Sequence, residues 1–302
     1  MRLVITGASG FIGTALCSQL LEKGHQLTLL THSAPRSANA EMKRWHHWTP
    51  GTPGDWESTL EGADGVINLA GEPIAAKRWT PNQKRKIRIS RIDATNSLLG
   101  AIAKAKQKPA FLLNASAVGY YGPRGDEIIT EDTEPGNDFL SSVCRDWEDE
   151  AKKAEPLGLR VIRLRTGIVL GKGGGALPKM SLPFKFFVGG PLGPGNQWMP
   201  WIHLDDEVGL MLYLIENSAA NGPFNATAPN PERMKEFCQI LGKVMRRPSW
   251  LRAPAFALRS ALGEMAEMLL TGQRAVPAAA QRLGYEFKYP HLTEALQACM
   301  PI

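Results

Sequence analysis

Short apolar runs alternate with helical patterns along the first two thirds of the chain. Between the runs, apolar residues recur at helical spacing, as at Phe11, Leu16 and Leu20. This alternation predicts βαβ units, and therefore an α/β fold of the Rossmann type, a doubly wound parallel sheet with helices on both faces. The runs have the composition and length of buried parallel strands. They are Leu3–Thr6, Gln26–Thr31, Gly65–Leu69, Ala110–Ala115 and Arg160–Arg165.

The pattern changes after Gly167, where the chain becomes rich in glycine and proline. Long connections of this composition often carry function, so we expect loop insertions at 171–201 that contribute to a substrate cleft. Beyond residue 228 helical patterns dominate. We therefore predict a dinucleotide-binding Rossmann domain over 1–228 and a smaller, mostly helical C-terminal lobe over 229–302.

A glycine-rich turn directly follows the first predicted strand. In such a turn the first glycine allows a sharp bend, the second lets backbone N–H groups approach a pyrophosphate, and the third lets the helix pack close to the strand. The helix N-terminus adds unpaired N–H groups and partial positive charge, which favour phosphate. We expect the cofactor to contact Gly7, Ser9, Gly10, Phe11, Ile12 and Gly13.

The end of the second predicted strand indicates which cofactor binds. An NAD site usually has Asp or Glu there, which accepts a hydrogen bond from a ribose hydroxyl. This chain instead has Thr31 and His32, with Arg36 close behind. A 2′-phosphate would be attracted by an imidazole and a guanidinium and repelled by a carboxylate. The sequence therefore favours NADP at these three residues and leaves NAD open.

Composition and charge narrow the class of protein. The hydrophobic share of 43% and the charged share of 21% are ordinary for a globular protein. No apolar run approaches the roughly 20 residues that a membrane span needs, and no leader precedes the first strand. We therefore expect a cytoplasmic protein without a membrane partner.

The net charge of +6 raises the question of an anionic partner. The densest basic segment, residues 84–88, predicts either a solvated helix face or a contact with a cofactor phosphate. No recognisable nucleic-acid-binding module accompanies it, so we expect no nucleic acid partner. The four cysteines are scattered and no Cys or His lies at ligand spacing, so we expect no metal site.

Several motifs together resemble a known group, the extended short-chain dehydrogenase/reductase superfamily, which includes nucleotide-sugar epimerases and dehydratases. Within it, the chain is similar to a branch called the epimerase family proteins, or SDR39U1-like proteins, over essentially its whole length. The segments that carry the resemblance are 6–13, 68–74, 78–80, 90–91, 116–122, 165–171, 201–206 and 225–231.

The resemblance implies further cofactor contacts at the ends of later strands. Arg91 matches a basic position that accompanies NADP in the branch, whereas His32 departs from it, since relatives often carry Arg there. The segment 166–168 is expected near the nicotinamide. The residues implied in this way are Leu69, Ala70, Gly71, Glu72, Arg91, Thr166, Gly167 and Ile168.

The catalytic residues of the superfamily are only partly present. Its active members use a Ser or Thr, a Tyr, and a Lys four residues later, whose charge lowers the pKa of the phenol. Ser116 fits the first position. Glu148 matches a Glu that follows the Lys by four, which places Cys144 at the Lys position and Leu140 at the Tyr position. We expect Ser116 and Tyr121 to polarise a carbonyl or hydroxyl beside the nicotinamide instead.

Two classes of function stay open. One is an NADP-dependent oxidoreductase or epimerase acting on a small polar or nucleotide-linked substrate. The other is a sensor or scaffold that binds NADP(H) without turnover, which the missing Tyr and Lys favour. The long loop that ends at Trp198 and Trp201 favours the enzyme, and we expect both indoles to line the substrate crevice. The sequence identifies neither the substrate nor the oligomeric state.

Overall fold

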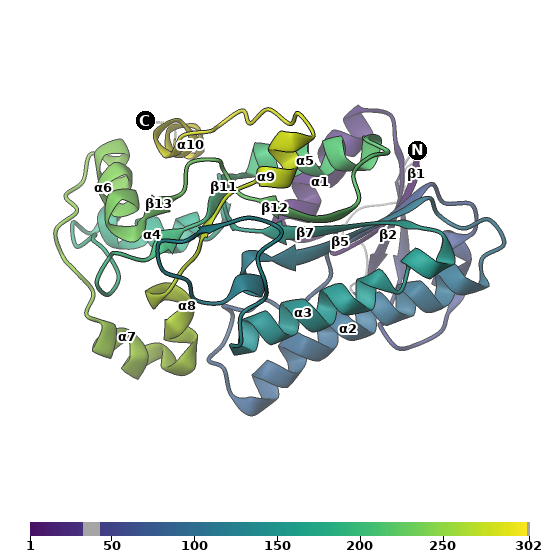
Figure 1. Ribbon diagram of the computed structural model, residues 1–302, viewed down its shortest axis with the longest axis horizontal. Helices are drawn as coiled ribbons and strands as arrows, with labels where there is room; N and C mark the ends of the chain where they lie inside the picture. Colours follow the sequence, from purple (N-terminus) through teal and green to yellow (C-terminus); the bar gives the residue numbers. More distant parts are fainter. Residues whose placement is uncertain (33–42, 301–302) are drawn as a thin grey trace.

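The computed structural model describes residues 1–32 and 43–300 (Figure 1). Its centre is a seven-stranded sheet in the order β12-β7-β5-β4-β1-β2-β3, in which every neighbouring pair is parallel. The predicted Rossmann-type, doubly wound fold is confirmed. The strands are β1 (Arg2–Thr6), β2 (Gln26–Thr31), β3 (Lys43–His47), β4 (Gly65–Asn68), β5 (Phe111–Ala117), β7 (Arg160–Thr166) and β12 (Gly222–Ala226).

All five predicted strands form the middle of this sheet, each within two residues of its predicted ends. The two edge strands were not predicted as strands. The edge strand β3 has the sequence KRWHH, which contains one apolar residue. The other, β12, contains Gly222 and Pro223, which are rare in central strands but tolerated at an edge.

Helices cover both faces of the sheet (Figure 1). On one face α1 (Phe11–Glu22) packs beside α5 (Leu204–Glu216), and on the other α2 (Pro81–Lys104) packs beside α3 (Phe139–Lys152). Each face has its own buried apolar core, and alternate residues of β1 contribute to one or the other, Ile5 to the first and Val4 to the second. Burial of these two layers is the main stabilising term of the fold.

Short elements lie in the connections between the strands. The predicted loop region 171–201 is partly regular, because it contains the short strands β9 and β10, the helix α4 and the first residue of β11. Strands β9 and β11 pair with β8 in a three-stranded sheet. These elements are η1 (Asp55–Leu60), η2 (Val118–Tyr121), β6 (Ile128–Ile129), η3 (Glu155–Leu157), β8 (Ile168–Gly171), β9 (Gly174–Gly175), α4 (Leu177–Lys185), β10 (Trp198–Met199) and β11 (Trp201–His203).

The chain beyond β12 is mostly helical and contains two short strands that pair with earlier segments, β13 with β10 and β14 with β6. A third apolar core lies between α4, α6 and α10. None of the helices in the described part of the chain is long and apolar enough to span a membrane. The later elements are β13 (Glu232–Arg233), α6 (Met234–Met245), α7 (Ala255–Leu262), η4 (Gly263–Ala266), α8 (Glu267–Leu270), β14 (Arg274–Ala275), α9 (Ala278–Arg282) and α10 (Leu292–Cys299).

Candidate functional site

The glycine-rich turn joins β1 to α1 at the point where the strand order reverses, because β1 pairs with β2 on one side and with β4 on the other. Ligands of open α/β sheets bind at such a switch point. Gly7 has φ +70°, and a Cβ there would lie 2.5 Å from the carbonyl oxygen of Leu69. A Cβ on Gly13 would lie 2.3 Å from the oxygen of Gly7. Both positions therefore need glycine for the fold itself.

Gly10 differs from the other two glycines. A Cβ there would have a single neighbour, the oxygen of Gly7 at 3.3 Å, and both Ser9 and Gly10 are exposed. Gly10 is also the N-cap of α1, and no side chain caps the helix. The first N–H groups of α1 thus face open space at the switch point, which is the arrangement that a pyrophosphate needs. Phe11 and Ile12, which follow, are half-buried.

A buried hydrogen-bond network holds the strand ends beneath this turn. Thr6 Oγ1 donates to Asn68 Oδ1 at 2.7 Å, and Asn68 Nδ2 donates to Asn114 Oδ1 at 2.7 Å and to Thr95 Oγ1 at 3.1 Å. The network ties β1, β4, β5 and α2 together. Because each member is satisfied and buried, it fixes the spacing of the strands that would carry the cofactor.

The residues implied after β4 do lie together. Leu69 and Ala70 are half-buried, and Gly71 is exposed against the guanidinium of Arg91, whose Cζ would lie 3.0 Å from a Cβ on Gly71. Arg91 Nη1 donates to the carbonyl oxygen of Glu72 at 3.1 Å, and its guanidinium lies 5.1 Å from the centre of the Trp147 ring. A positive charge is therefore fixed at the carboxyl end of β4.

The residues expected to choose between NADP and NAD are partly described. Thr31 ends β2, and His32 is exposed and stacks on Trp48 with ring centres 6.0 Å apart. Arg36 lies outside the described residues. A Rossmann site for NAD would have a carboxylate at the end of β2, and His32 stands there in this chain.

The segment after β7 is packed tightly against the chain before β11. A Cβ on Gly167 would lie 2.3 Å from the carbonyl oxygen of Pro200, and Ile168 N donates to that oxygen at 2.7 Å. Thr166 Oγ1 donates to Glu207 Oε1 at 2.8 Å. Burial raises the pKa of Glu207 to about 8, so this carboxyl is largely protonated at neutral pH. Glu207 is not among the residues that the sequence predicted for the site.

Ser116, the penultimate residue of β5, lies beside a buried ion pair. Its Oγ donates to Glu148 Oε1 at 2.8 Å, and Arg165 Nε and Nη2 donate to the two oxygens of the same carboxylate at 2.8 and 2.9 Å. Glu148 and Arg165 are almost completely buried. Ser116 is 5% exposed, so its hydroxyl is held by the ion pair rather than presented to solvent.

The structure argues against the expected role of Tyr121. Its side chain is fully buried, its hydroxyl donates to Asn225 Oδ1 at 2.7 Å, and it accepts from Arg165 Nη1 at 2.8 Å. Burial raises the pKa of the phenol to about 12. The reason is local, because the 3₁₀ turn η2 directs neighbouring side chains to different sides. Tyr120 is half-buried, with the Arg165 guanidinium 3.6 Å from its ring centre.

Helix α3 occupies the place where the superfamily carries Tyr and Lys, and it carries neither function here. A Cβ on Gly119, in η2, would lie 3.4 Å from Leu140 Cβ and 3.9 Å from Cys144 Sγ. Burial raises the pKa of the Cys144 thiol to about 12, so it stays neutral. Leu140 and Cys144 therefore place apolar groups beside η2 and supply neither a proton nor a charge.

A hollow of about 510 Å³ lies around Trp198, between the loop that follows β5 and the C-terminal segments. Arg124 and Arg233 line the hollow. The guanidinium groups of Arg233 and Arg274 lie 4.8 and 4.7 Å from the Trp198 ring centre. Asp126 Oδ1 accepts from Trp198 Nε1 at 2.8 Å and from Arg233 Nη2 at 2.7 Å. Cations outnumber the carboxylate, so the hollow favours an anionic ligand.

Trp201 does not share this hollow. It is fully buried and its Nε1 donates to the carbonyl oxygen of Asn230 at 3.1 Å, so of the two tryptophans expected to line a crevice only Trp198 borders this hollow. Arg124, Arg233 and Arg274 were missed because they are far apart in the sequence. Among the described residues, no three His, Cys, Asp or Glu side chains gather as a metal site would require.

Comparison with known proteins assigns the chain to a family. Residues 3–227 match the NAD dependent epimerase/dehydratase family. The chain belongs to this family. A member from Arabidopsis thaliana, the chloroplastic epimerase family protein SDR39U1 homolog, is 43% identical over 303 residues, covering 99% of this chain and 87% of its own. The resemblance to SDR39U1-like epimerase family proteins, predicted from the motifs, is thereby confirmed.

Two solved structures share the complete fold. Human epimerase family protein SDR39U1 (isoform 2), crystallised with NADPH, matches with a TM-score of 0.87 and 31% identity, covering 99% of both chains. A nucleoside-diphosphate sugar epimerase from Corynebacterium glutamicum matches with a TM-score of 0.80 and 35% identity, covering 99% of this chain and 58% of its own. Residues 253–299 match a separate domain of unknown function.

Proposed function

We propose that the protein is an NADPH-dependent oxidoreductase or epimerase that acts on an anionic, nucleotide-linked substrate. The observation that carries the cofactor assignment is the open N-terminus of α1 at the β1/β4 switch point, where Gly10 leaves room that a side chain would fill. The human relative that shares the fold was crystallised with NADPH. When bound, the nicotinamide would supply or accept the hydride.

The chain's own residues would bind and orient the reactants. Backbone N–H groups at Gly10 and in the first turn of α1 would hold the pyrophosphate, and His32 with Arg36 would attract the 2′-phosphate. The charge of Arg91 beside Gly71 would lie along the cofactor. Ser116 would be held by Glu148 near the carboxyl end of β5. In η2, which follows, Tyr120 is half-buried and is the phenol that a substrate would reach.

The hollow around Trp198 supports the substrate class. It lies beyond the carboxyl ends of the strands, where substrates of this fold bind, and its arginines match a phosphate or carboxylate. The indole of Trp198 offers a flat surface for a base or sugar ring. The Corynebacterium relative is described as a nucleoside-diphosphate sugar epimerase, and its substrate class is the one we propose here.

A second candidate is a protein that binds NADPH without turnover. Leu140 and Cys144 at the positions of Tyr and Lys favour it, and so does the burial of Tyr121. The same cofactor site serves both candidates. They differ in whether a substrate is converted, which consumes NADPH in a reductase and leaves the cofactor unchanged overall in an epimerase.

The test adds a panel of nucleoside-diphosphate sugars and small carbonyl compounds to the protein with NADPH or NADP. Oxidation of NADPH is followed at its absorbance maximum, and epimerised products, which form without net use of the cofactor, are followed by chromatography. The enzyme proposal expects at least one compound to be reduced or epimerised, with KM raised roughly tenfold and kcat little changed in Arg274→Met. Lys108→Met, an exposed cation before the amino end of β5, is the matched control. NADPH binding without turnover across the panel would support the non-catalytic candidate.

A further inference from the structure

Large apolar side chains cluster on one part of the surface. Seven of the ten large hydrophobic residues that are exposed in the described part of the chain lie between residues 182 and 188 or between 250 and 256. The most exposed are Phe256 at 75%, Phe186 at 69% and Trp250 at 66%. We call the set Phe186, Phe187, Val188, Trp250, Leu251 and Phe256 the apolar patch. Exposed patches of this kind mark interaction surfaces.

The two segments lie side by side because hydrogen bonds join the backbone after residue 188 to the backbone at residues 250 and 251. Trp250 N and Leu251 N donate to the carbonyl oxygen of Gly189 at 3.0 and 3.1 Å, and Trp250 Nε1 donates to that of Phe187 at 2.9 Å. Phe187 has φ +62°, a strained value for an aromatic residue. The backbone is thus held in a shape that leaves the apolar side chains uncovered.

Helix α7 extends the same surface. Its sequence, AFALRSAL, contains one charged residue, and none of its eight residues is buried. In Figure 1 it lies at the lower left edge of the molecule, away from the central sheet. A helix of this composition normally packs its apolar face against the protein. Here Leu258 and Leu262 are half-buried, whereas Phe256, Ala257 and Ala261 are exposed, so part of the apolar surface of the helix stays uncovered by the described residues.

The charges around the patch are mainly positive, and the two carboxylates that follow α7, Glu264 and Glu267, are paired with Lys84 and Arg259. Residues 156–204 and 237–263 contain no Asp or Glu. Six exposed cations stand in and beside the patch, and none of them forms an ion pair with the described residues. They are Lys179, Lys185, Lys243, Arg246, Arg247 and Arg252. Their number equals the net charge of the whole chain, +6.

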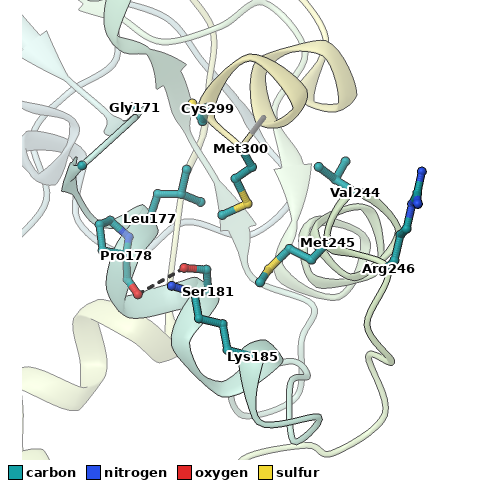
Figure 2. Close-up of a pocket in the computed structure, with 11 residues that line it drawn as sticks. Gly171, Leu177, Pro178, Ser181, Lys185, Val244, Met245, Arg246, Cys299 and Met300 are labelled. Atoms are coloured by element: carbon teal, nitrogen blue, oxygen red, sulfur yellow. Dashed lines mark hydrogen bonds between the residues drawn. The ribbon is translucent and has the colours of Figure 1, made fainter. Parts of the chain in front are cut away.

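A cavity of about 440 Å³ lies beside the patch, between α4, α6 and the end of α10 (Figure 2). Leu177, Met245 and Met300 give it an apolar wall, and Lys185 and Arg246 are among the residues that line it. An apolar recess flanked by positive charge suits a molecule that is anionic at one end and apolar along the rest.

We propose that this face binds the surface of membranes that contain anionic phospholipids. The protruding aromatic side chains would enter the interface, and the cations would lie against the lipid phosphates. A second copy of the chain fits less well, because a symmetric contact would bring the six cations of each copy together. Lying on a membrane needs no spanning helix, so the proposal departs from the expectation of no membrane partner while agreeing with the absence of a long apolar run.

Sedimentation of the full-length protein with lipid vesicles tests this. We expect binding to vesicles of phosphatidylcholine mixed with phosphatidylglycerol, little binding to phosphatidylcholine alone, and weaker binding at high salt. The double variant Trp250→Ser, Phe256→Ser should bind roughly tenfold more weakly, and Ile128→Ser, exposed outside the patch, should bind as the wild type does. Unchanged NADPH affinity of the variants would show that they are folded.

The charges are tested separately. Lys185→Glu with Arg252→Glu should weaken binding about tenfold or more, whereas Lys106→Glu with Lys108→Glu, the same change of charge on another surface, should not. The proposal is overturned if vesicle binding does not depend on phosphatidylglycerol, or if patch variants sediment with vesicles as their controls do. Patch variants that instead dissociate a dimer in analytical ultracentrifugation would assign the face to self-association or to a protein partner and overturn it too.

Discussion

Gly7, Gly10 and Gly13 meet different neighbours, although the sequence motif treats them as one feature. A Cβ on Gly7 or Gly13 would overlap backbone atoms at 2.5 Å or less, whereas a Cβ on Gly10 would meet one carbonyl oxygen at 3.3 Å. Gly7 and Gly13 therefore serve the fold, and Gly10 is free to serve a ligand. The motif alone could predict the turn, and the structure separates these two requirements.

Substitutions at the two kinds of glycine should have opposite signatures. Gly10→Val should abolish NADPH binding and leave the thermal unfolding midpoint close to the wild-type value, since its side chain points to the phosphate site. Gly13→Ala should lower the midpoint markedly, because the helix must move away from the strand. Cofactor fluorescence and thermal unfolding measure both. NADPH affinity unchanged in Gly10→Val would mean that the site lies elsewhere.

Glu207 makes stability depend on pH. Its folded pKa of about 8 lies above the ordinary value of 4.5, since burial disfavours the charge. The stability that this group contributes is therefore fully present below about pH 4.5 and is lost as pH rises through about 8, by several kcal/mol at most. Glu207→Gln should flatten this dependence, and its unfolding midpoint should exceed that of the wild type at about pH 9. Glu294→Gln, an exposed control, should follow the wild type; an equally steep dependence in Glu207→Gln would contradict the assignment.

Side-chain roles at the catalytic end of the site were less predictable than the glycines. The sequence indicated that Leu140 and Cys144 replace Tyr and Lys, and the structure places both beside η2. The sequence could not show that Tyr121 points into the core, because Tyr120 and Tyr121 are adjacent and no sequence pattern indicates which of the two is buried. The ion pair of Arg165 with Glu148 joins β7 to α3, and only the folded sheet brings the two together.

At the scale of elements, a side-chain N-cap defines where helix α3 begins. Asp138 is the N-cap of α3, and its Oδ1 accepts from Ser141 N at 2.7 Å and from Ser141 Oγ at 2.6 Å. The carboxylate also lies at the positive end of the helix dipole. This cap holds the helix that carries Cys144 and Glu148 against the end of β5.

Removing the cap should destabilise the protein measurably. Asp138→Ala is expected to lower the free energy of unfolding by about 1–2 kcal/mol, as a lost N-cap does. Asp149→Ala removes an exposed carboxylate from the same helix. Asp149 pairs with the exposed Lys152, so this change should have a smaller effect. Urea unfolding of the two variants decides the point. Equal losses would show that the cap has no special contribution.

The central strands could be predicted because burial on both faces makes them mostly apolar, as in the run Leu3, Val4 and Ile5 of β1. The edge strands could not, because β3 is exposed enough to be polar and β12 carries Gly222 and Pro223. The pairing of β14 with β6 joins residues more than a hundred positions apart and has no local signal. Glycine and proline in residues 171–201 predict a loop. The structure instead has β9 paired antiparallel with β8, and Phe11 lies against Gly174 in β9.

At the scale of the whole molecule, the parallel sheet places the carboxyl ends of the strands that precede the expected cofactor segments at one end of the sheet. The ends of β1, β2, β4, β5 and β7 all point the same way, because each neighbouring pair is parallel. The chain beyond β12 adds Arg233 and Arg274 beside Trp198 at the same side of the molecule. The proposed patch around α7 lies on a different set of segments, so cofactor binding and membrane binding can be tested independently.

The central claim is that NADPH binds at the β1/β4 switch point. Its most direct test is titration of the purified protein with NADPH and with NADH, followed by nicotinamide fluorescence. The account predicts saturable binding with NADPH tighter than NADH by roughly tenfold or more, because His32 stands where an NAD site has a carboxylate and a 2′-phosphate adds charge-assisted contacts. Equal affinities, tighter binding of NADH, or no saturable binding of either would contradict it.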